Sequence, residues 1–388
     1  EVSTLNPQTF FGLFGPFADQ FDSRYGSNTE AWALYAQVDA ELTDALKLTL
    51  GGRYTEETKD ISRYLELLRA SDGTPVPFVV ADFEAGDLPD AKFDNFSPSA
   101  TLSYQINPDV NVYARYAKGF KSGGFNGETN AFFDFSDPNC PSGAPELCNP
   151  YRPEKVDSFE IGLKSILADG ALTFNMAAFL NKNKDIQLSV FDASGAASST
   201  VLNAAEATIW GVEIEASARP AEGFNVYGSF AYLNAEYDSF IEVNPVTTLP
   251  EDVSDDRAFP HTPEFTIAVG ADWTVAEGDW GKFNLLGDLS MVSSYYTFPY
   301  SFGRVPNAAG QLAQTTESDG RTILNMRAVL SELNLGGVDA KISAWVNNLT
   351  DESDASNFID FGPAFGGLLL GYFPDRRTYG LTVGVKFQ

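Results

Sequence analysis

The sequence predicts an all-β protein, a transmembrane antiparallel β-barrel of which about 13 strands can be read along the chain. Three observations predict this fold. Apolar and polar residues alternate with a period of two through nearly the whole chain, as strands with two different faces require. Short and long connections alternate strictly between these strands. One face carries many charged side chains, whereas the opposite face is nearly free of charge.

The composition agrees with this fold and excludes several classes of protein. The 388 residues include 31 Phe and 16 Tyr, and aromatic side chains suit a pleated sheet. The formal net charge of −28 argues against nucleic-acid binding, because no basic stripe is present to neutralise phosphates. No run approaches the roughly 18 consecutive apolar residues of a transmembrane helix. A transmembrane strand needs only about 9–11 alternating residues.

The first two predicted strands show the alternation most clearly. In residues 32–42 the even positions are apolar, and the odd positions include Gln37, Asp39 and Glu41. Residues 46–55 repeat the pattern. The charged face is unsuited to a soluble sandwich, whose inner faces must be apolar, whereas a water-filled or plugged lumen accommodates it. The predicted strands cover residues 32–42, 46–55, 96–105, 110–116, 158–164, 172–176, 212–215, 224–230, 265–273, 284–291, 324–330, 341–347 and 377–387.

The connections between these strands are of two kinds. Outer-membrane barrels have short periplasmic turns and long extracellular loops, whereas a soluble meander has no reason to sort its loops in this way. The tight turns lie around residues 43–44, 107–109, 168–170, 220–223, 276–279 and 335–337. The long connections cover residues 62–94, 120–153, 183–200, 239–261, 299–320 and 351–375.

The orientation of the strands predicts that this barrel portion is incomplete. Residues 377–387 follow a long loop and residues 32–42 end at a short turn, so both strands run from outside to inside. The number of strands is then odd, whereas closed bacterial barrels have even numbers. We therefore expect residues 1–30 to be an extracellular loop or the end of a truncated upstream region. Residues 31–388 would be the C-terminal part of the barrel. A faint strand within residues 10–21 is the alternative.

The two cysteines lie close together in a segment rich in Pro, Gly and Asn. Cys140 and Cys148 are expected to form a local disulfide in an oxidising compartment; two unpaired thiols are the alternative. A zinc site is not expected, because the only histidine, His261, is far away along the chain and the ligand spacing is wrong.

An ordered set of short phrases runs along the chain from Trp32 onward. Each phrase is weak alone, but the ordered set resembles the TonB-dependent receptors of the bacterial outer membrane over almost the whole chain. The phrases are Leu-Thr-Leu-Gly-Gly-Arg-Tyr-Thr at 48–55, Val-Tyr-Ala-Arg-Tyr-Ala-Lys-Gly-Phe-Lys-Ser-Gly-Gly-Phe-Asn at 112–126, Pro-Glu at 153–154, Glu-Ile-Gly-Leu-Lys at 160–164, Asp-Ile-Gln at 185–187, Asn-Ala at 203–204, Gly-Val-Glu-Ile-Glu at 211–215, His-Thr-Pro at 261–263 and Asn-Asn-Leu-Thr-Asp at 347–351.

This resemblance implies a barrel of about 22 strands with a plugged lumen. The family's plug and its TonB-contacting segment, the TonB box, have no counterpart in this chain, and roughly nine further strands would lie upstream. The resemblance also implies active uptake of a scarce nutrient, most often a ferric siderophore. Its partners would be TonB acting through the plug, the barrel-assembly machinery, outer-membrane lipid and the small-molecule substrate. No cofactor is expected.

Two other transport functions stay open from the sequence. One is TonB-dependent uptake of oligosaccharides or phenolic compounds, and the other is a passive outer-membrane porin. An enzyme is not expected. A Ser-His pair would have to use His261, and no Gly-x-Ser-x-Gly nucleophile phrase accompanies it.

The last predicted strand carries an alternating apolar pattern up to the end of the chain. In the receptor family this strand ends on an aromatic residue that the barrel-insertion machinery reads. Here the aromatic residue is penultimate and Gln388 follows it. The residues of the expected signal are Tyr379, Leu381, Val383, Val385 and Phe387.

Aromatic residues of the long loops are candidates for substrate contact, because aromatic faces suit catecholate, porphyrin or sugar ligands. The candidates are Tyr300, Phe302, Phe361, Phe365 and Tyr372. The neighbouring Tyr295 and Tyr296 are assigned instead to the aromatic girdle at the membrane interface.

Charged residues supply the remaining candidates. Lumen-facing Arg115 and Arg327, together with Arg53, would clamp an anionic chelate or pair with carboxylates of the plug or lumen. The acidic run at 251–256 suggests Ca²⁺ binding, but its spacing favours a solvated loop. His261, between two prolines, is expected to mark the re-entry into a strand and to have no chemical role.

Overall fold

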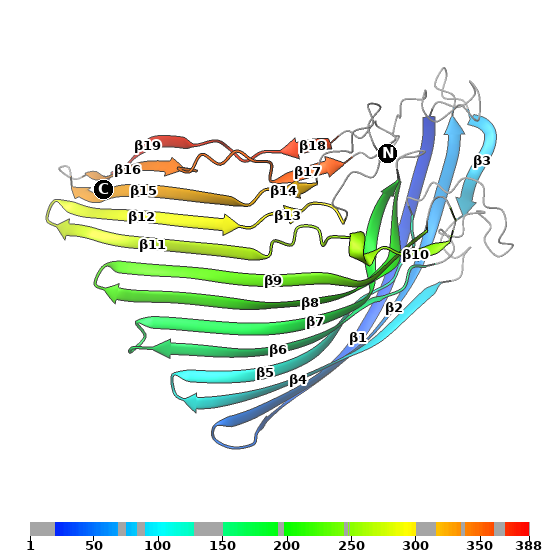
Figure 1. The fold of residues 1–388 in the computed structure, drawn as a ribbon, viewed down its shortest axis with the longest axis horizontal. Coiled ribbons are helices and arrows are strands. Elements are labelled where there is room, and N and C mark those ends of the chain that lie inside the picture. Colours follow the sequence, from blue (N-terminus) through cyan, green and yellow to red (C-terminus); the bar gives the residue numbers. More distant parts are fainter. Residues whose placement is uncertain are drawn as a thin grey trace.

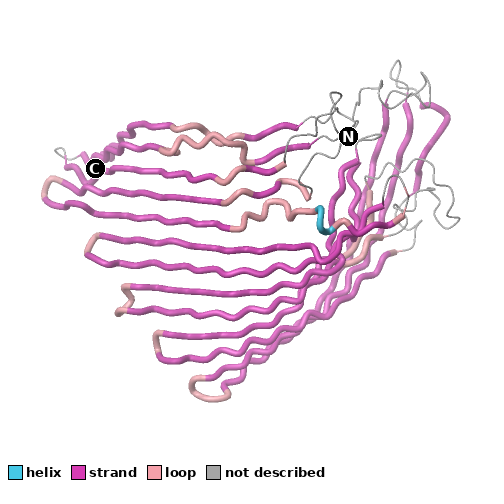
Figure 2. The backbone as a smooth tube through the Cα atoms, in the orientation of Figure 1, coloured by secondary structure: helices cyan, strands magenta, loops and turns pink. Residues whose placement is uncertain are grey.

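The computed structural model shows an almost entirely β architecture. It describes residues 20–68, 75–83, 90–127, 150–192, 198–243, 247, 249–299, 316–334, 338–360 and 369–387. One large antiparallel sheet curves around an open interior (Figures 1 and 2). Its strands follow the order β1-β2-β4-β5-β6-β7-β8-β9-β11-β12-β15-β16-β19. This path of thirteen strands matches the predicted number.

The bounds of the elements follow. The strands of the path are β1 (Gln20–Glu41), β2 (Leu46–Leu68), β4 (Ala91–Asn107), β5 (Val110–Lys121), β6 (Glu154–Leu167), β7 (Leu172–Asp192), β8 (Ser198–Ala221), β9 (Phe224–Val243), β11 (Phe265–Gly278), β12 (Gly281–Val292), β15 (Arg321–Asn334), β16 (Val338–Asn347) and β19 (Thr378–Phe387). Shorter elements are β3 (Pro75–Phe83), β10 (Pro250–Asp252), the 3₁₀ turn η1 (Ser254–Asp256), β13 (Tyr295–Tyr296), β14 (Glu317–Ser318), β17 (Asn357–Asp360) and β18 (Leu369–Tyr372).

The connections sort to opposite ends of the wall. Tight turns join β1 to β2, β4 to β5, β6 to β7, β8 to β9, β11 to β12 and β15 to β16, along the left and lower edge of Figure 1. Longer connections, with the short strands, lie at the other end. We call these the turn end and the loop end. The predicted alternation of short and long connections is therefore confirmed.

The turn between β6 and β7 shows how local sequence closes these hairpins. Ala168, Asp169 and Gly170 all have positive φ, at 52°, 50° and 84°. Gly170 adopts this conformation without steric cost, and Asp is among the residues that tolerate it best after Gly. The N–H of Ala171 donates to the carbonyl of Ala168 at 3.0 Å, which completes the turn.

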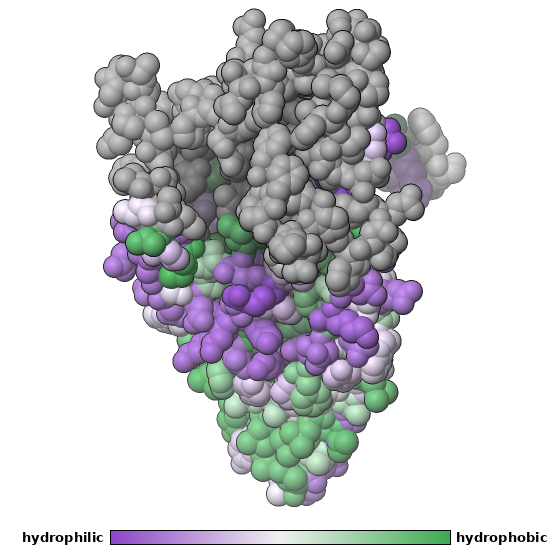
Figure 3. Space-filling model, turned by 90° about the vertical axis from the view of Figure 1, so that its right-hand side faces the viewer, coloured by the Kyte–Doolittle hydropathy of each residue, from purple (hydrophilic) through white to green (hydrophobic). Residues whose placement is uncertain are grey.

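The two faces of the wall differ in chemistry. On one face large apolar side chains are exposed, among them Leu34 at 70%, Val38 at 64% and Ile161 at 63%. Such exposure suits a lipid-facing outer surface. Figure 3 shows a hydrophobic area in the lower part of the view with a hydrophilic band above it. Aromatic rings pair across strands on the outer face: Trp32 with Tyr54 at 5.4 Å, Tyr116 with Phe159 at 5.1 Å and Trp210 with Tyr232 at 5.2 Å.

Several strands extend further toward the loop end than the sequence suggested. β2 continues to Leu68, β7 to Asp192 and β9 to Val243, into segments expected to be loops. β1 begins at Gln20, so the boundary drawn at residue 30 falls inside a strand. Beyond the apolar band neither face of a hairpin needs to meet lipid, so alternation is irregular in the extensions of β2 and β9. In β7 a short alternating run, Ile-Gln-Leu-Ser-Val at 186–190, follows a polar stretch at 181–185.

Most of the buried apolar residues in the described ranges lie at the loop end, while Val329 and Ala340 lie near the turn end of β15 and β16. Ile61, Phe93, Ala205, Ala207 and Phe240 are each less than 9% exposed. The strand extensions and the segments folded against them therefore form the packed part of the described structure. No helix in the described ranges is long and apolar enough to cross a membrane.

The closing strand β19 pairs with β16 along its whole length, from Asn347–Thr378 to Val338–Phe387. Tyr379, Leu381 and Val383 share one face and are 81%, 76% and 67% exposed, and Val385 is 55% exposed on the same face. The backbone of Phe387 ends the strand. The pattern expected of an insertion signal is thus presented on the outer face, and its recognition stays a prediction.

Candidate functional site

The inner face of the wall carries a row of polar and charged residues in register. Asp39, Thr49, Thr101, Arg115 and Glu160 are successive cross-strand neighbours from β1 to β6. Their side chains point away from the apolar outer face, because alternate residues of a strand face opposite sides. A row of this kind suits a hydrated or plugged interior.

The two predicted arginines both lie on this inner face, but they are far apart. Arg115 in β5 stands between Thr101 and Glu160. Arg327 in β15 stands between Leu286 and Trp345. Seven strand-to-strand steps separate β5 from β15, and each step is about 4.8 Å, so they are roughly 34 Å apart around the wall. The wall alone does not bring them into one site.

The remaining predicted residues divide between the loop end and segments outside the described residues. Tyr372 in β18 pairs with Asn357 and is 53% exposed. The other loop aromatics and both cysteines lie outside the described residues, and their assignments stay predictions. These are Tyr300, Phe302, Phe361, Phe365, Cys140 and Cys148.

A hydrogen-bond network joins four of the phrases singled out in the sequence at the loop end. The side-chain amide of Gln187 donates to the carbonyls of Ser122 at 2.8 Å and Arg152 at 3.0 Å. Its backbone N–H donates to the Glu154 carboxylate at 3.0 Å. The loop after β5 and the start of β6 are thereby tied to β7.

Asparagines extend this network, which we call the rim network, to β8. Asn203 donates from Nδ2 to the Arg152 carbonyl at 2.8 Å, and its Oδ1 accepts the Arg152 N–H at 2.6 Å. The guanidinium of Arg152 pairs with Asp185. Asn126 makes the same two-way contact with the backbone of Val201, at 3.0 and 2.7 Å. These residues therefore hold the rim together, a structural role that their positions in separate phrases did not reveal.

An aromatic cluster packs on the inner face beside this network. The ring of Tyr237 stacks on Phe259 at 4.1 Å and meets Phe240 edge-on at 5.0 Å. Buried Ile186 and Ala207 lie beneath. Burial raises the pKa of Tyr237 to about 12, so its hydroxyl stays neutral at physiological pH. The cluster could not be predicted from sequence alternation, because Phe259 lies in a segment expected to be a loop.

The segment that carries Phe259 is itself anchored by charged side chains. Arg257 pairs with Glu242 at 2.9 and 3.2 Å, and its side chain is only 4% exposed. The carboxylate of Asp252 accepts the N–H groups of Phe240 at 3.0 Å and Ser254 at 3.1 Å, which lowers its pKa. Within the described ranges no three His, Cys, Asp or Glu side chains gather as a metal site. Asp252 is therefore a cap for the loop.

Tyr295 lies in a polar and aromatic group at the loop end of the wall, and its assignment to the aromatic girdle stays a prediction. Its hydroxyl donates to the Ser356 carbonyl at 2.7 Å and accepts from Arg321 at 3.2 Å. The ring of His261 lies 6.0 Å away. His261 has a φ of 55°, and its N–H donates to the Tyr296 carbonyl at 2.7 Å. The histidine thus shapes the re-entry of the chain before β11.

A second hydrogen-bond network, centred on Asn348, connects the closing strand β19 to its neighbours. The buried amide of Asn348 donates to the carbonyls of Glu352 and Asp375, both at 2.9 Å, and its Oδ1 accepts the Glu352 N–H at 2.9 Å. Asp351 binds the guanidinium of Arg376 at 2.8 and 3.2 Å. The Asn-Asn-Leu-Thr-Asp phrase is therefore a connection between β15, β16 and β19.

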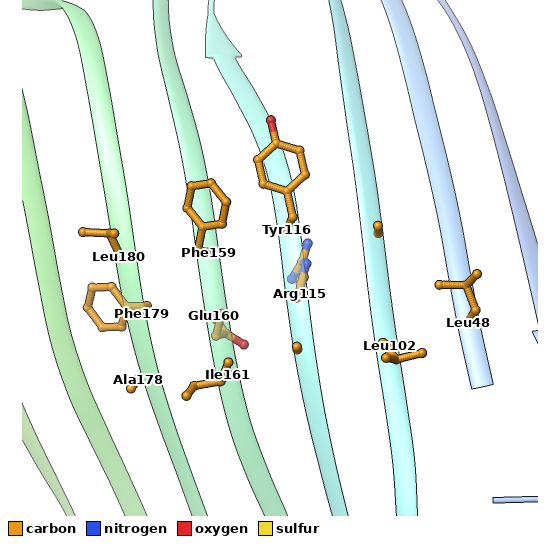
Figure 4. A pocket seen from close by; sticks show the side chains of 12 residues that line it. Leu48, Leu102, Arg115, Tyr116, Phe159, Glu160, Ile161, Ala178, Phe179 and Leu180 are labelled. Carbon is orange, nitrogen blue, oxygen red and sulfur yellow. The ribbon is translucent and has the colours of Figure 1, made fainter. Parts of the chain in front are cut away.

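Hollows lie on both faces of the wall. One of about 350 Å³ is on the inner face, bordered by Glu215, Tyr227, Ser229 and Asp288. A hollow of about 550 Å³ lies between β2 and β7 on the outer face and is mostly apolar (Figure 4). The inner hollow lies on the polar side of the wall, whereas the outer one lies on its apolar side.

Comparison with known proteins agrees with this architecture. Residues 3–349 match the family described as TonB dependent receptor-like, beta-barrel. The crystal structure of the ferric yersiniabactin uptake receptor FyuA from Yersinia pestis is similar, with a TM-score of 0.67 and 20% identity, over 94% of this chain and 47% of that one. At this identity the similarity shows the fold.

Curated relatives are similar over part of their length. The pesticin receptor of Yersinia enterocolitica is 26% identical over 199 residues, which is 51% of this chain and 25% of the relative. The metal-pseudopaline receptor CntO of Pseudomonas aeruginosa is 25% identical over 215 residues, 55% of this chain and 25% of the relative. The chain thus aligns with about a quarter of the length of these relatives.

Proposed function

Because the chain belongs to the TonB-dependent receptor β-barrel family, we propose that its protein takes up a ferric siderophore or a similar iron complex, with energy delivered through TonB. The family is found in the bacterial outer membrane. The loop end is then extracellular and the turn end is periplasmic. The family and its structural neighbours are transport receptors.

The family match over residues 3–349 is the observation that carries this proposal. It covers every strand of the path except β19 and includes the rim network, whereas most residues of the network around Asn348 lie after residue 349. Three of the similar proteins are named as receptors for pesticin, for metal-pseudopaline and for ferric yersiniabactin uptake. Two of these three names include a metal complex, which supports an iron or other metal chelate over a sugar.

We assign chelate contacts to residues that are both exposed and inside the barrel or at its mouth. Arg115 and Arg327 offer guanidinium groups on the inner face, and guanidinium binds carboxylate and catecholate oxygens strongly. Tyr372 offers an exposed ring at the loop end. The side chains of the Tyr237 cluster and of Arg257 already contact other residues of the protein. We therefore assign them a structural role at the loop end and no contact with the chelate.

Growth and uptake in a deletion strain test the proposal. The strain should grow poorly under iron limitation when a single siderophore is the iron source, and ⁵⁵Fe uptake should return with the intact gene. Uptake should be absent in a strain that lacks TonB. A growth defect that occurs only on a glycan or a phenolic compound would indicate that this compound, and not an iron complex, is the substrate. Uptake that persists without TonB would indicate a passive porin.

Single substitutions test the assigned contacts. R115Q removes one charge-assisted hydrogen-bonding group, which is worth about 1.5–3 kcal/mol, so half-saturation of uptake should need roughly 10- to 100-fold more chelate. R219Q is the matched control, because Arg219 lies next to the turn end and donates to the Gly170 carbonyl at 2.8 Å. Equal affinities for R115Q and R219Q would remove Arg115 from the site.

A further inference from the structure

The apolar hollow on the outer face has a floor of short side chains. Ala100, Ala114 and Ala178 come from β4, β5 and β7. The rings of Tyr116 and Phe159 border it, 5.1 Å apart (Figure 4). The hollow measures about 550 Å³ and faces the lipid. A smooth apolar wall would need no such recess, so a particular acyl chain is a suitable occupant.

Four lysines lie on the same face, between this hollow and the loop end. Alternation places Lys118 two residues beyond Tyr116, and Lys155 four residues beyond Phe159. Lys182 and Lys184 follow in the same way from Leu180. At about 3.3 Å per residue these steps are roughly 7 and 13 Å along the strands. We call these four lysines the basic patch; it stands at the level expected for lipid headgroups.

The charges of the basic patch are not balanced within the described residues. Lys155 and Lys184 are direct cross-strand partners, and like charges in this position destabilise a sheet. Asp157 lies between Lys118 and Lys182 and supplies one negative charge among the four lysines; its carboxylate also accepts the Tyr116 hydroxyl at 2.7 Å. In the described part of the chain none of the four lysines makes an ion pair within 4.0 Å.

The surroundings confine this positive charge to a small area. On one side the outer face of β2 and β4 carries Glu56 and Asp94. On the other side Glu206 of β8 lies beside Lys184, opposite the irregularity at residues 184–185. β9 carries Glu236 and Asp238, and Asp238 accepts the Thr208 hydroxyl at 2.8 Å. The whole chain has a net charge of −28. A local cluster of cations on so acidic a protein indicates a specific anionic partner.

We propose that the outer face of β4–β7 binds a phosphorylated lipid of the outer membrane. Its phosphate contacts the basic patch and one acyl chain fills the apolar hollow. Ammonium groups form charge-assisted hydrogen bonds with phosphate oxygens, and basic residues at a membrane surface attract anionic lipids. This site is separate from the transported substrate, because it lies on the opposite face of the wall from Arg115.

Lipid titration of the intact protein in detergent, followed by native mass spectrometry, tests the proposal. Dimyristoyl phosphatidic acid should bind at least tenfold more tightly than dimyristoyl phosphatidylcholine. The variant K118Q/K155Q/K182Q/K184Q should lose this preference. K47Q/K282Q/K341Q/K386Q removes the same charge away from this surface and should retain the preference. A178F fills the hollow and should weaken phosphatidic acid binding severalfold while the lysines remain.

Three results would overturn the proposal. They are equal binding of the two lipids, an unchanged preference in the variant of the basic patch, and unchanged affinity in A178F. Competition with inorganic phosphate distinguishes a lipid site from a site for free anions. Millimolar phosphate should not displace the lipid, and full displacement would overturn the proposal. Heat-modifiable gel mobility reports folding. If the fourfold variant fails to fold, K155Q/K184Q serves in its place and should reduce the preference.

Discussion

Single polar side chains stabilise the loop end by replacing backbone partners. Gln187, Asn203, Asn126 and Asn348 each bond carbonyl or N–H groups of a distant segment. Such groups need partners wherever strands separate from their neighbours. The long side-chain amides supply both a donor and an acceptor. Asn and Gln are therefore placed where the ladder of the sheet is interrupted.

The pH dependence of stability should report the Asp351 contact. The Arg376 guanidinium and the Arg377 N–H hold the pKa of Asp351 below its ordinary 3.8. The stabilisation is thus present above about pH 4 and is lost as the pH falls through the lower pKa of the folded state. D351N should lower the urea midpoint of the protein refolded in lipid vesicles at pH 7, and the difference from wild type should shrink toward pH 3.

The exposed Asp319 provides the control for this measurement. Its carboxylate has no ion pair within the described ranges. D319N should therefore match wild type at both pH values. A difference between D351N and wild type that is the same at pH 7 and pH 3 would contradict the assigned role of the Asp351 carboxylate.

At the scale of elements, hairpins that extend beyond the apolar band need packing of their own. The segment after β5 turns back against β2 and β4. Lys59 of β2 donates to the Gly123 carbonyl at 2.8 Å. Gly123 fits there because it has no side chain. A Cβ at this position would collide with the Tyr151 carbonyl and the Phe93 ring. Close backbone approach, and not a positive φ, is the reason for this glycine.

Substituting Gly123 should loosen the loop end while the wall persists. G123A should lower the free energy of unfolding by about 1–3 kcal/mol, the usual cost of overpacking, and should speed cleavage of the loops by protease added to intact cells. G384A is the control, because nothing lies within 4 Å of its added Cβ; its change should stay within about 0.5 kcal/mol. Unchanged protection in G123A would rule out the tight contact.

The whole molecule separates its side chains by environment. Apolar residues cover the outer face of the wall, and charged residues line the inner face and the loop end. An apolar belt must face lipid on all described strands of the path at the same height. This requirement aligns the thirteen strands of the path at one height, whereas the proposed orientation follows from the lengths of the connections at the two ends.

Cysteine labelling should confirm this orientation in cells. D255C lies in η1 at the loop end and should react with a membrane-impermeant maleimide on intact cells. E222C lies in the turn between β8 and β9 and should react only after the outer membrane is opened. The unsubstituted protein measures any background from Cys140 and Cys148. Labelling of E222C on intact cells would reverse the assigned orientation.

Much of the wall could be predicted from local sequence. The thirteen strands, their tight turns and their two faces follow from alternation and from residues such as Asp169 and Gly170, because side-chain direction and turn conformation depend on neighbours along the chain. The inner-face position of Arg115 follows in the same way. The extensions of β2, β7 and β9 were not predicted, because alternation is irregular in those of β2 and β9 and the short alternating run of β7 at 186–190 follows a polar stretch at 181–185.

The candidate sites depended on the tertiary structure. The rim network joins residues up to 75 positions apart, the Tyr237 cluster needs a loop folded across strand ends, and the basic patch exists only in one register of β5, β6 and β7. The sequence by itself determined which residues face lipid or the interior, since that choice is local. Which residues meet across strands was decided only by the register, since a shift by one residue exchanges the two faces and a shift by two residues exchanges the neighbours.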